Sequence, residues 1–298
     1  MARPDLALAV PISLSPWARR FPPEGRARLL LLLPALVFLL LVFAYPLGLI
    51  VIRSVTDPLP GIDHYVQIAT VDVYLRVLTS TFGLALTVTL ATFVLGYPVA
   101  YVLARSQGLL QAIFIMLVLL PFWTSLLVRT YAWMVILGRY GVVNKTLMAL
   151  GLTDEPVRLL HTGLATHIGM IHILLPFMIL PIWSVMTRID PALLMAARSL
   201  GASPLRTFLR VFFPLSLPGV FAGGLFVFIL ALGFYITPAL LGGPSDLTIS
   251  MLIAQQVSEL LAWGFASALA VTLLVVTLAV IFLAGSVLGL EKIWEGFK

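Results

Sequence analysis

The sequence predicts an all-α polytopic membrane protein with six transmembrane helices. Hydrophobic residues make up 61% of the 298 residues and charged residues only 10%, whereas a soluble domain carries about 25% charged residues. A chain this apolar could not cover its own surface in water, so it requires a bilayer. Six apolar runs are long enough for a helix to cross a bilayer, and each of them predicts one span.

The predicted spans are Leu29–Ile52, Phe82–Ala104, Leu109–Leu137, His161–Met186, Leu217–Leu241 and Gly264–Leu290. The third run is longer than one crossing needs and contains Pro121, which predicts a kinked or split helix. Pro238 and the glycines after it predict a broken helix near the end of the fifth span, and Gly96-Tyr97-Pro98 predicts a second break in the second span. The alternative at either site is a simple kink for helix packing. Gly219 and Gly223 have the spacing that allows two helices to approach closely.

Lys and Arg residues outside the spans lie mainly on one side of the predicted bilayer, which is the cytoplasmic side by the positive-inside rule. The richer side holds Arg3, Arg19, Arg20, Arg26, Arg28, Arg105, Arg188, Arg198, Arg206, Arg210, Lys292 and Lys298, and the other side holds Arg53, Arg76, Arg139, Lys145 and Arg158. We therefore expect a multi-pass protein of the inner (cytoplasmic) membrane with both termini in the cytoplasm. This topology explains the formal net charge of +6 without a nucleic-acid partner.

The predicted domain organisation follows from these spans. Residues 1–28 form a cytoplasmic lead, residues 29–76 the first transmembrane helix and an outer loop, residues 77–290 a core of five transmembrane helices, and residues 291–298 a cytoplasmic tail. A cytoplasmic loop at residues 188–214 interrupts the core.

The loop at 188–214 predicts two short helices joined by a tight turn. Asp190 and Ser203 each precede a proline, which is the pattern of an N-cap followed by proline in the first turn. Gly201 is placed to stop the first helix, and Pro214 is expected to end the second. The apolar positions that predict amphipathic faces are Leu194, Ala197 and Leu200, then Leu205, Phe208, Leu209 and Phe212.

The order of Ala196-Ala197, Gly201, Val211 and Phe213-Pro214 in this loop resembles the EAA loop of ABC importer permeases. In that family the loop is a coupling helix that docks into a cleft of a separate ATPase subunit. Met195 stands at the usual glutamate position, so a salt bridge from that position would be lost while apolar docking would remain. The resemblance implies that the chain couples to the ATPase through Met195, Ala196, Ala197, Arg198, Gly201, Arg206, Val211 and Pro214.

The resemblance covers approximately Val77 to Leu290 and implies the type I architecture of ABC importer permeases. It also implies two copies of an ABC ATPase subunit, a second homologous permease subunit and a periplasmic or lipid-anchored solute-binding protein as partners. The chain has no GxxxxGK[ST] phosphate-binding motif, so ATP would be bound and hydrolysed on another chain. We expect a transport subunit with no enzymatic activity, no cofactor and no metal site.

Arg129 is the one formally charged residue within a predicted span, and aromatic residues surround it in the sequence at Trp123, Tyr131 and Trp133. A charge at this depth suggests function, as a group on the solute pathway or a subunit surface. The alternative is an arginine that extends to the outer interface from an aromatic belt. The segment resembles the matching part of permeases of the spermidine/putrescine group, which favours polyamine import. Another small organic ion or an inorganic anion is the alternative solute.

A polyamine pathway should offer carboxylates or aromatic faces, yet no Asp or Glu lies within a predicted span. Asp246 and Glu259, in the last outer loop, could line an entrance with Trp263, Tyr235 and Phe234. They could equally be solvated loop acids, and a partner permease could carry the decisive carboxylates.

The histidines and the remaining polar residues favour no other class of protein. His161, His167 and His172 are six and five residues apart, which does not place two imidazoles on one helical face for a metal, so we expect packed, hydrogen-bonded side chains. An ion-coupled secondary transporter would need an acid within the spans, and an intramembrane enzyme would need a serine with a histidine nearby in sequence. Neither is present in the sequence.

Overall fold

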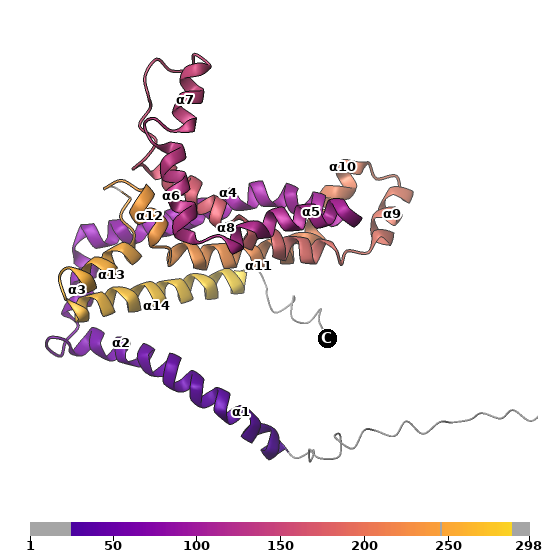
Figure 1. Ribbon diagram of the computed structural model, residues 1–298. Helices are drawn as coiled ribbons and strands as arrows, with labels where there is room; N and C mark the ends of the chain where they lie inside the picture. The colour runs from indigo at the N-terminus through magenta and orange to yellow at the C-terminus, as the bar shows by residue number, and fades with distance from the viewer. Residues whose placement is uncertain (1–24, 245, 288–298) are drawn as a thin grey trace, which may run out of the picture. The chain divides into compact units, whose positions relative to one another are not determined.

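The computed structural model describes residues 25–244 and 246–287, and these residues form helices joined by turns and loops, with no strand among them (Figure 1). The predicted all-α class is therefore confirmed. Most of the predicted lead and the whole predicted tail, together with the last three residues of the sixth predicted span, lie outside the described residues. The chain divides into two units, residues 1–52 and residues 53–298, which are described separately.

The described part of the first unit is a long apolar helix, whose last residues, 53–56, belong to the second unit. Helix α1 (Gly25–Leu39) passes through a π-helical turn, η2 (Leu40–Ala44), into α2 (Tyr45–Thr56). The Tyr45 N–H bonds to the Leu40 carbonyl O, five residues back, and Pro46 follows directly. Because proline has no N–H and crowds the carbonyl four residues earlier, the wider π-turn accommodates it within a continuous helix. The stretch Leu32–Thr56 is long and apolar enough to cross a membrane, as predicted.

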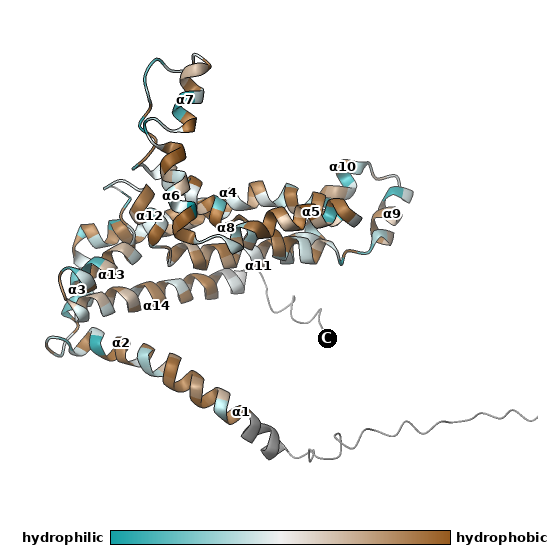
Figure 2. Ribbon diagram, in the orientation of Figure 1, coloured by the Kyte–Doolittle hydropathy of each residue, from teal (hydrophilic) through white to brown (hydrophobic). Residues whose placement is uncertain are grey.

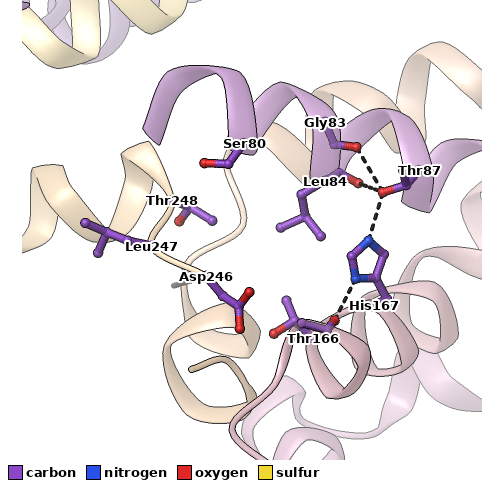
Figure 3. A pocket seen from close by; sticks show the side chains of 10 residues that line it. Ser80, Gly83, Leu84, Thr87, Thr166, His167, Asp246, Leu247 and Thr248 are labelled. Carbon is purple, nitrogen blue, oxygen red and sulfur yellow. Dashed lines mark hydrogen bonds between the residues drawn. The ribbon is translucent and has the colours of Figure 1, made fainter. Parts of the chain in front are cut away.

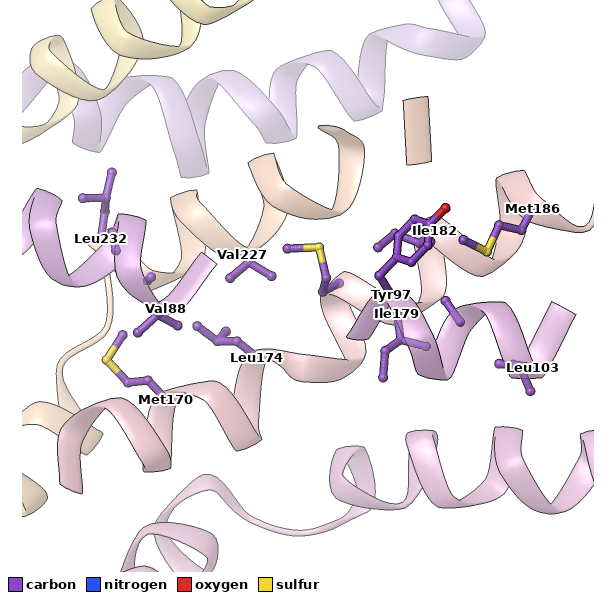
Figure 4. Packing of buried hydrophobic residues seen from close by; sticks show 14 of the residues in the cluster. Val88, Tyr97, Leu103, Met170, Leu174, Ile179, Ile182, Met186, Val227 and Leu232 are labelled. Atoms are coloured by element: carbon purple, nitrogen blue, oxygen red, sulfur yellow. The ribbon is translucent and has the colours of Figure 1, made fainter. Parts of the chain in front are cut away.

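Three helices form the core of the second unit. Helices α4 (Asp72–Arg105), α8 (Gly163–Met186) and α11 (Phe213–Leu232) pack on one another along their lengths (Figure 1). Figure 4 shows the side chains that fill the space between them. The buried residues at these contacts include Val88, Ala100, Leu103, Met170, Leu174, Met178, Ile179, Ile182, Val227 and Ala231.

Helix α4 is continuous, so the predicted break at Gly96-Tyr97-Pro98 is wrong. Pro98 lies inside the helix, and contacts on both neighbouring helices explain why the chain stays helical there. A Cβ on Gly96 would be 3.2 Å from Ile179 Cγ1 on α8, and the Tyr97 hydroxyl lies 2.9 Å from the Ser216 hydroxyl on α11. Tertiary packing thus overrides the local cost of a proline.

The close approach predicted from Gly219 and Gly223 is confirmed. A Cβ on Gly219 would be 2.9 Å from the Pro181 carbonyl O, and one on Gly223 would be 2.9 Å from the Met178 carbonyl O. Both contacts are with the backbone of α8, so only glycine permits this separation of α8 and α11.

The third predicted span is split, as expected from Pro121. Helix α5 (Gly108–Leu119) and a 3₁₀ turn, η3 (Leu120–Trp123), are followed by extended backbone at 124–125, then by α6 (Leu126–Leu137) and α7 (Val142–Ala149). Helix α6 packs against α8 and against α12 (Ile236–Leu241). The stretch long and apolar enough to span a membrane here is Leu126–Ala149, with Gly108–Trp123 a shorter apolar helix. The predicted single run from Leu109 to Leu137 is therefore two segments.

The end of the bundle opposite to the 188–214 loop is built from two short helices and the start of a long one. Helices α3 (Asp63–Thr70), α13 (Ile249–Ser258) and α14 (Trp263–Val287) pack around a second buried cluster that includes Ile68, Phe265 and Leu269. The Ile249 N–H donates to the Thr81 hydroxyl at 3.0 Å, which ties the start of α13 to α4. Figure 2 shows that the long helices are apolar along most of their length. Within the described residues six helical stretches are long and apolar enough to span a membrane.

Candidate coupling surface and solute pathway

The 188–214 loop begins as a compact helical knob, which we define as residues 190–207. Asp190 Oδ1 accepts the Ala192 N–H at 2.8 Å and caps α9 (Pro191–Ser199). The helix ends at Gly201, which has φ +83°. The Gly201 N–H bonds to the Arg198 carbonyl O and the Ala202 N–H to the Ala197 carbonyl O, and this pair of bonds is a Schellman motif. Ser203 Oγ accepts the Arg206 N–H at 3.3 Å and caps α10 (Pro204–Thr207), so the two predicted helices and their turn are confirmed.

The prediction that Pro214 ends the second helix is wrong. A π-helical turn, η4 (Phe208–Phe212), follows α10 and leads directly into α11, so the helix runs from Pro204 to Leu232. The Phe213 N–H bonds to the Phe208 carbonyl O, five residues back. As at Pro46, the wider turn precedes the proline and relieves the clash that an α-helical turn would create.

An aromatic cluster fixes the base of the knob to α4. Phe208 and Phe212 pack edge-on against Tyr101, with ring centroids 5.7 and 5.2 Å from it. The Arg105 guanidinium lies 4.8 Å from the centroid of the Tyr101 ring, within the range of a cation–π interaction. The buried hydrogen bond between Tyr97 and Ser216 lies beside this cluster, so the knob and the bundle meet through specific contacts.

The rest of the knob presents apolar side chains to the surroundings. Leu200 is 89% exposed, the highest value among the described large hydrophobic residues, and Met195 and Leu205 are 60% and 68% exposed. A shallow groove of about 250 Å³ runs beside the Gly201 turn. Thr207 is among the residues that line it, and its hydroxyl is buried with no hydrogen-bond partner among the described residues.

The structure brings together part of the predicted coupling set. Ala197, Gly201, Arg206 and Val211 line the groove, together with Leu200, Ala202 and Arg210, which were not in that set. Met195, Ala196 and Arg198 lie on α9, exposed and outside the groove lining, and Pro214 lies on the first turn of α11. Of the predicted apolar faces, Leu194, Phe208 and Phe212 pack against the bundle, whereas Leu200, Leu205 and Leu209 are exposed.

Arg129 lies on α6 and is half-buried. Its Nε is buried with no hydrogen-bond partner among the described residues. The adjacent Thr130 faces α12, with its hydroxyl 3.3 Å from that of Thr237. Trp133 donates its Nε1–H to His172 Nδ1 at 3.3 Å, which links α6 to α8.

The other aromatic candidates, Trp123, Tyr131 and Tyr235, are all exposed. Trp123 and Tyr131 are 77% and 54% exposed, on η3 and α6 respectively. Tyr235 is 46% exposed in the non-helical stretch Gly233–Tyr235 that separates α11 from α12. This interruption confirms the predicted broken tip of the fifth span, although it precedes Pro238, which lies inside α12.

The two candidate acids do not share a site. Asp246 lines a cavity between α4, the start of α8 and the segment that leads into α13 (Figure 3). Glu259 is exposed at the end of α13, where it accepts a hydrogen bond from Gln255 Nε2 at 3.2 Å. Neither Glu259 nor Trp263 lines the cavity around Asp246.

The cavity also holds polar residues that the sequence did not single out as site residues, namely Ser80, Thr87, Thr166 and Thr248. The prediction of hydrogen-bonded histidines is confirmed at two positions. His167 Nε2 lies 2.9 Å from the Thr87 hydroxyl and joins α8 to α4, and His172 pairs with Trp133.

The family described as "Binding-protein-dependent transport system inner membrane component" matches residues 92–288. The chain belongs to this family. The predicted resemblance to ABC importer permeases is therefore confirmed, and the protein is a multi-pass inner-membrane permease subunit rather than an enzyme.

Curated relatives of this permease are substantially similar to it. The spermidine/putrescine transport system permease protein PotB of Escherichia coli (strain K12) is 39% identical over 215 residues, which are 72% of this chain and 78% of the relative. PotB of Haemophilus influenzae is 36% identical over 70% of this chain and 73% of the relative. The putative 2-aminoethylphosphonate permease protein PhnU of Salmonella typhimurium is 30% identical over 67% and 70% of the two chains.

A solved structure has the same fold. A chain of a bacterial ABC transporter involved in the import of the acidic polysaccharide alginate superposes with a TM-score of 0.73 at 22% sequence identity. The match covers 88% of this permease and 95% of that chain.

Proposed function

We propose that this permease forms half of the translocation pathway of an ATP-driven importer for polyamines such as spermidine and putrescine. The observation that carries the proposal is the 39% identity, over 72% of the chain, to a permease named for spermidine/putrescine transport. A second candidate solute is a small organic ion of another kind, because a permease named for 2-aminoethylphosphonate is 30% identical. The higher identity favours polyamines.

The proposed assembly contains two copies of an ABC ATPase, a second homologous permease and a solute-binding protein in the periplasm or on a lipid anchor. In this assembly residues 77–290 are the core domain, both termini lie in the cytoplasm and the knob docks on the ATPase. The exposed side chains of Met195, Leu200 and Leu205 support this role, because apolar groups projecting from a surface mark an interaction site. The groove beside Gly201, with its unpartnered Thr207 hydroxyl, would receive part of the ATPase.

Closure of the ATPase dimer would then move the knob. Because the helix is continuous from Pro204 to Leu232, that movement would reach the α8–α11 contact and the interruption at Gly233–Tyr235. Arg129 would contact the pathway or the second permease, where an acceptor would satisfy its buried Nε.

The test is purification from mild detergent with mass spectrometry of the proteins that remain bound, followed by uptake of labelled spermidine and putrescine into proteoliposomes. We expect an ATPase and a second permease of similar size, and uptake that requires ATP and the binding protein. A chain that purifies alone and moves solute without ATP would contradict the importer assignment. A complete complex that takes up 2-aminoethylphosphonate but no polyamine would contradict the solute.

A further inference from the structure

We propose that the cavity around Asp246 binds a primary alkylammonium group, with the Asp246 carboxylate as its counter-charge. The inference rests on the proposed function, in which this end of the bundle faces outward and the solute is a polyamine. The cavity has a volume of about 290 Å³ and lies between α4, the start of α8 and the segment 246–248. Figure 3 shows the Asp246 carboxylate beside Thr166, across the open space from Ser80 and Leu84.

Two hydroxyl groups of the cavity, those of Ser80 and Thr166, are left as acceptors. Each hydroxyl has a single hydrogen to donate, and Ser80 Oγ donates it to the Arg76 carbonyl O at 2.8 Å. Thr166 Oγ1 donates to the Thr162 carbonyl O at 3.4 Å. The lone pairs of these oxygens are therefore available to a ligand that carries N–H donors.

His167 and Thr87 have partners within the protein. His167 Nδ1 lies 2.6 Å from the Gly163 carbonyl O, which can only accept, so Nδ1 donates its hydrogen there. His167 Nε2 lies 2.9 Å from the Thr87 hydroxyl, which also lies 2.9 Å from the Gly83 carbonyl O and 3.0 Å from the Leu84 carbonyl O. Both ring nitrogens of His167 are therefore bonded to the protein, so the acceptors open to a ligand are Asp246 and the other hydroxyl groups.

Asp246 brings a negative charge that this part of the chain does not neutralise. Its Oδ2 accepts the Gly243 N–H at 2.8 Å, and the described residues include no Lys or Arg within ion-pair distance. The N-terminus of α8 offsets part of the charge, but Thr162 and not Asp246 caps that helix. Because a half-buried charge at a membrane helix is costly without a partner, the carboxylate requires water or a cation.

The position and size of the cavity suit the end of an aliphatic amine. The cavity lies some way along α4 from the start of that helix. With a rise of 1.5 Å per residue, its α4 residues, Ser80 to Thr87, are roughly 12–22 Å from the first residue of the helix. The volume is more than ten times the roughly 10–15 Å³ that a cavity needs to hold one water molecule, so it exceeds what a bare ion needs. Leu84 offers an apolar wall to methylene groups. A Cβ on Gly83 would meet no atom within 4 Å, so this face of α4 leaves the cavity open.

The decisive experiment measures equilibrium binding of labelled spermidine to the detergent-purified permease complex, without ATP or binding protein. Asp246→Asn keeps the size of the side chain and an acceptor for the Gly243 N–H but removes the charge. Gly83→Phe is a steric variant that fills the cavity without a backbone clash. Asp154→Asn is the matched control, because Asp154 is an exposed loop acid that does not line the cavity.

We expect Asp246→Asn and Gly83→Phe each to weaken spermidine binding about tenfold or more, as for the loss of a charged hydrogen bond. Asp154→Asn should change it less than about twofold by the same scale. n-Butylammonium should compete with spermidine, and uncharged n-butanol should not. Wild-type affinity in Asp246→Asn, an equal loss in Asp154→Asn, or no spermidine binding to the wild-type complex would overturn the site.

Failure of this site is distinct from failure of the proposed function. ATP-dependent polyamine uptake by the wild-type complex decides the proposed function, whereas the contrast between the Asp246 and Asp154 variants decides the site. A transporter that imports spermidine equally well with Asp246→Asn and Gly83→Phe would keep its function and lose this assignment.

Discussion

Gly223 on α11 lies directly against the backbone of Met178 on α8. A Cβ added to Gly223 would be 2.9 Å from the Met178 carbonyl O and 3.2 Å from its Cα. Those atoms cannot rotate away as the end of a side chain can. On the adjacent Gly224, an added Cβ would meet only Thr89 Cγ2, at 3.8 Å, which is ordinary van der Waals contact. Two neighbouring glycines therefore differ in what they tolerate.

Gly223→Ala should destabilise the permease by about 1–3 kcal/mol, the usual cost of overpacking. Gly224→Ala should be neutral or stabilise it by up to about 1 kcal/mol, because alanine favours the helix. Unfolding midpoints of the two variants in mild detergent provide the measurement. Equal midpoints would mean that α8 and α11 are further apart than described.

The second prediction concerns the buried hydrogen bond between Tyr97 and Ser216. Ser216 Oγ donates to the Phe213 carbonyl O at 2.7 Å, so the Tyr97 hydroxyl is the donor to Ser216. Tyr97→Phe should cost about 1 kcal/mol of stability, and Ser216→Ala about 1–3 kcal/mol because it leaves a buried hydroxyl unpaired. The double variant should be less destabilised than the sum of the two, as a double-mutant cycle would reveal. Strict additivity would argue against the bond.

The third prediction concerns the Gly201 turn. Proline fixes φ near −65° and has no N–H, so Gly201→Pro is incompatible with φ +83° and removes the bond to Arg198. We expect this variant to insert and assemble but to transport at about a tenth of the wild-type rate or less, while the ATPase still hydrolyses ATP. Gly201→Asn should retain most transport, since asparagine tolerates the left-handed conformation. Normal transport by the proline variant would contradict the coupling role.

The fourth prediction concerns Leu200, whose substitution tests whether the knob is the surface that binds the ATPase. Leu200→Glu introduces a charge where an apolar partner surface is expected, and it should lower co-purification of the ATPase about tenfold, as for loss of an interface anchor. Leu59→Glu is the control, because Leu59 is 77% exposed in the loop before α3, on the opposite end of the second unit. Equal recovery of the ATPase with both variants would place the interface elsewhere.

Arg129 provides the fifth prediction. Since its Nε has no partner in the described chain, Arg129→Ala should not lower the stability of the isolated permease, because it removes an unpaired buried group. Uptake by the assembled transporter should fall about tenfold if a partner group pairs with the guanidinium, and Arg129→Lys should restore part of it. Wild-type uptake in Arg129→Ala would indicate an arginine that only extends to the membrane interface.

Local sequence rules predicted the features that depend on neighbouring residues. The caps at Asp190 and Ser203 and the stop at Gly201 follow from backbone chemistry within a few residues. The Gly219–Gly223 contact follows from a single helical spacing. The same rules failed at Pro98 and Pro214. Packing against neighbouring helices keeps α4 helical at Pro98, and a π-turn accommodates Pro214 within a continuous helix.

The cavity around Asp246 could not be predicted from the sequence, because the residues that line it are far apart along the chain. Asp246 was a candidate because it is an acid in the last predicted outer loop, where it could line an entrance for a polyamine, but nothing in the sequence joins it to Ser80 or Thr87. These hydroxyl residues lie on a helix more than 150 positions earlier, and serines and threonines of this kind are common in membrane helices. Asp246 and these hydroxyl residues come together because the segment before α13 contacts both α4, through the Ile249–Thr81 bond, and the start of α8 at Gly163.

The π-turn at Phe208–Phe212 sets the direction of the knob as well as accommodating Pro214. A π-turn contains one residue more than the α-helical turn it replaces, and each residue of an α-helix advances the chain by about 100° around the axis. Deleting one residue there would leave a long helix but would rotate Leu200 and its neighbours by about 100° around the helix axis. The direction in which the docking surface faces is therefore set by the rotation about the helix axis between the stretches before and after the π-turn. It does not depend on which side chains make the contact.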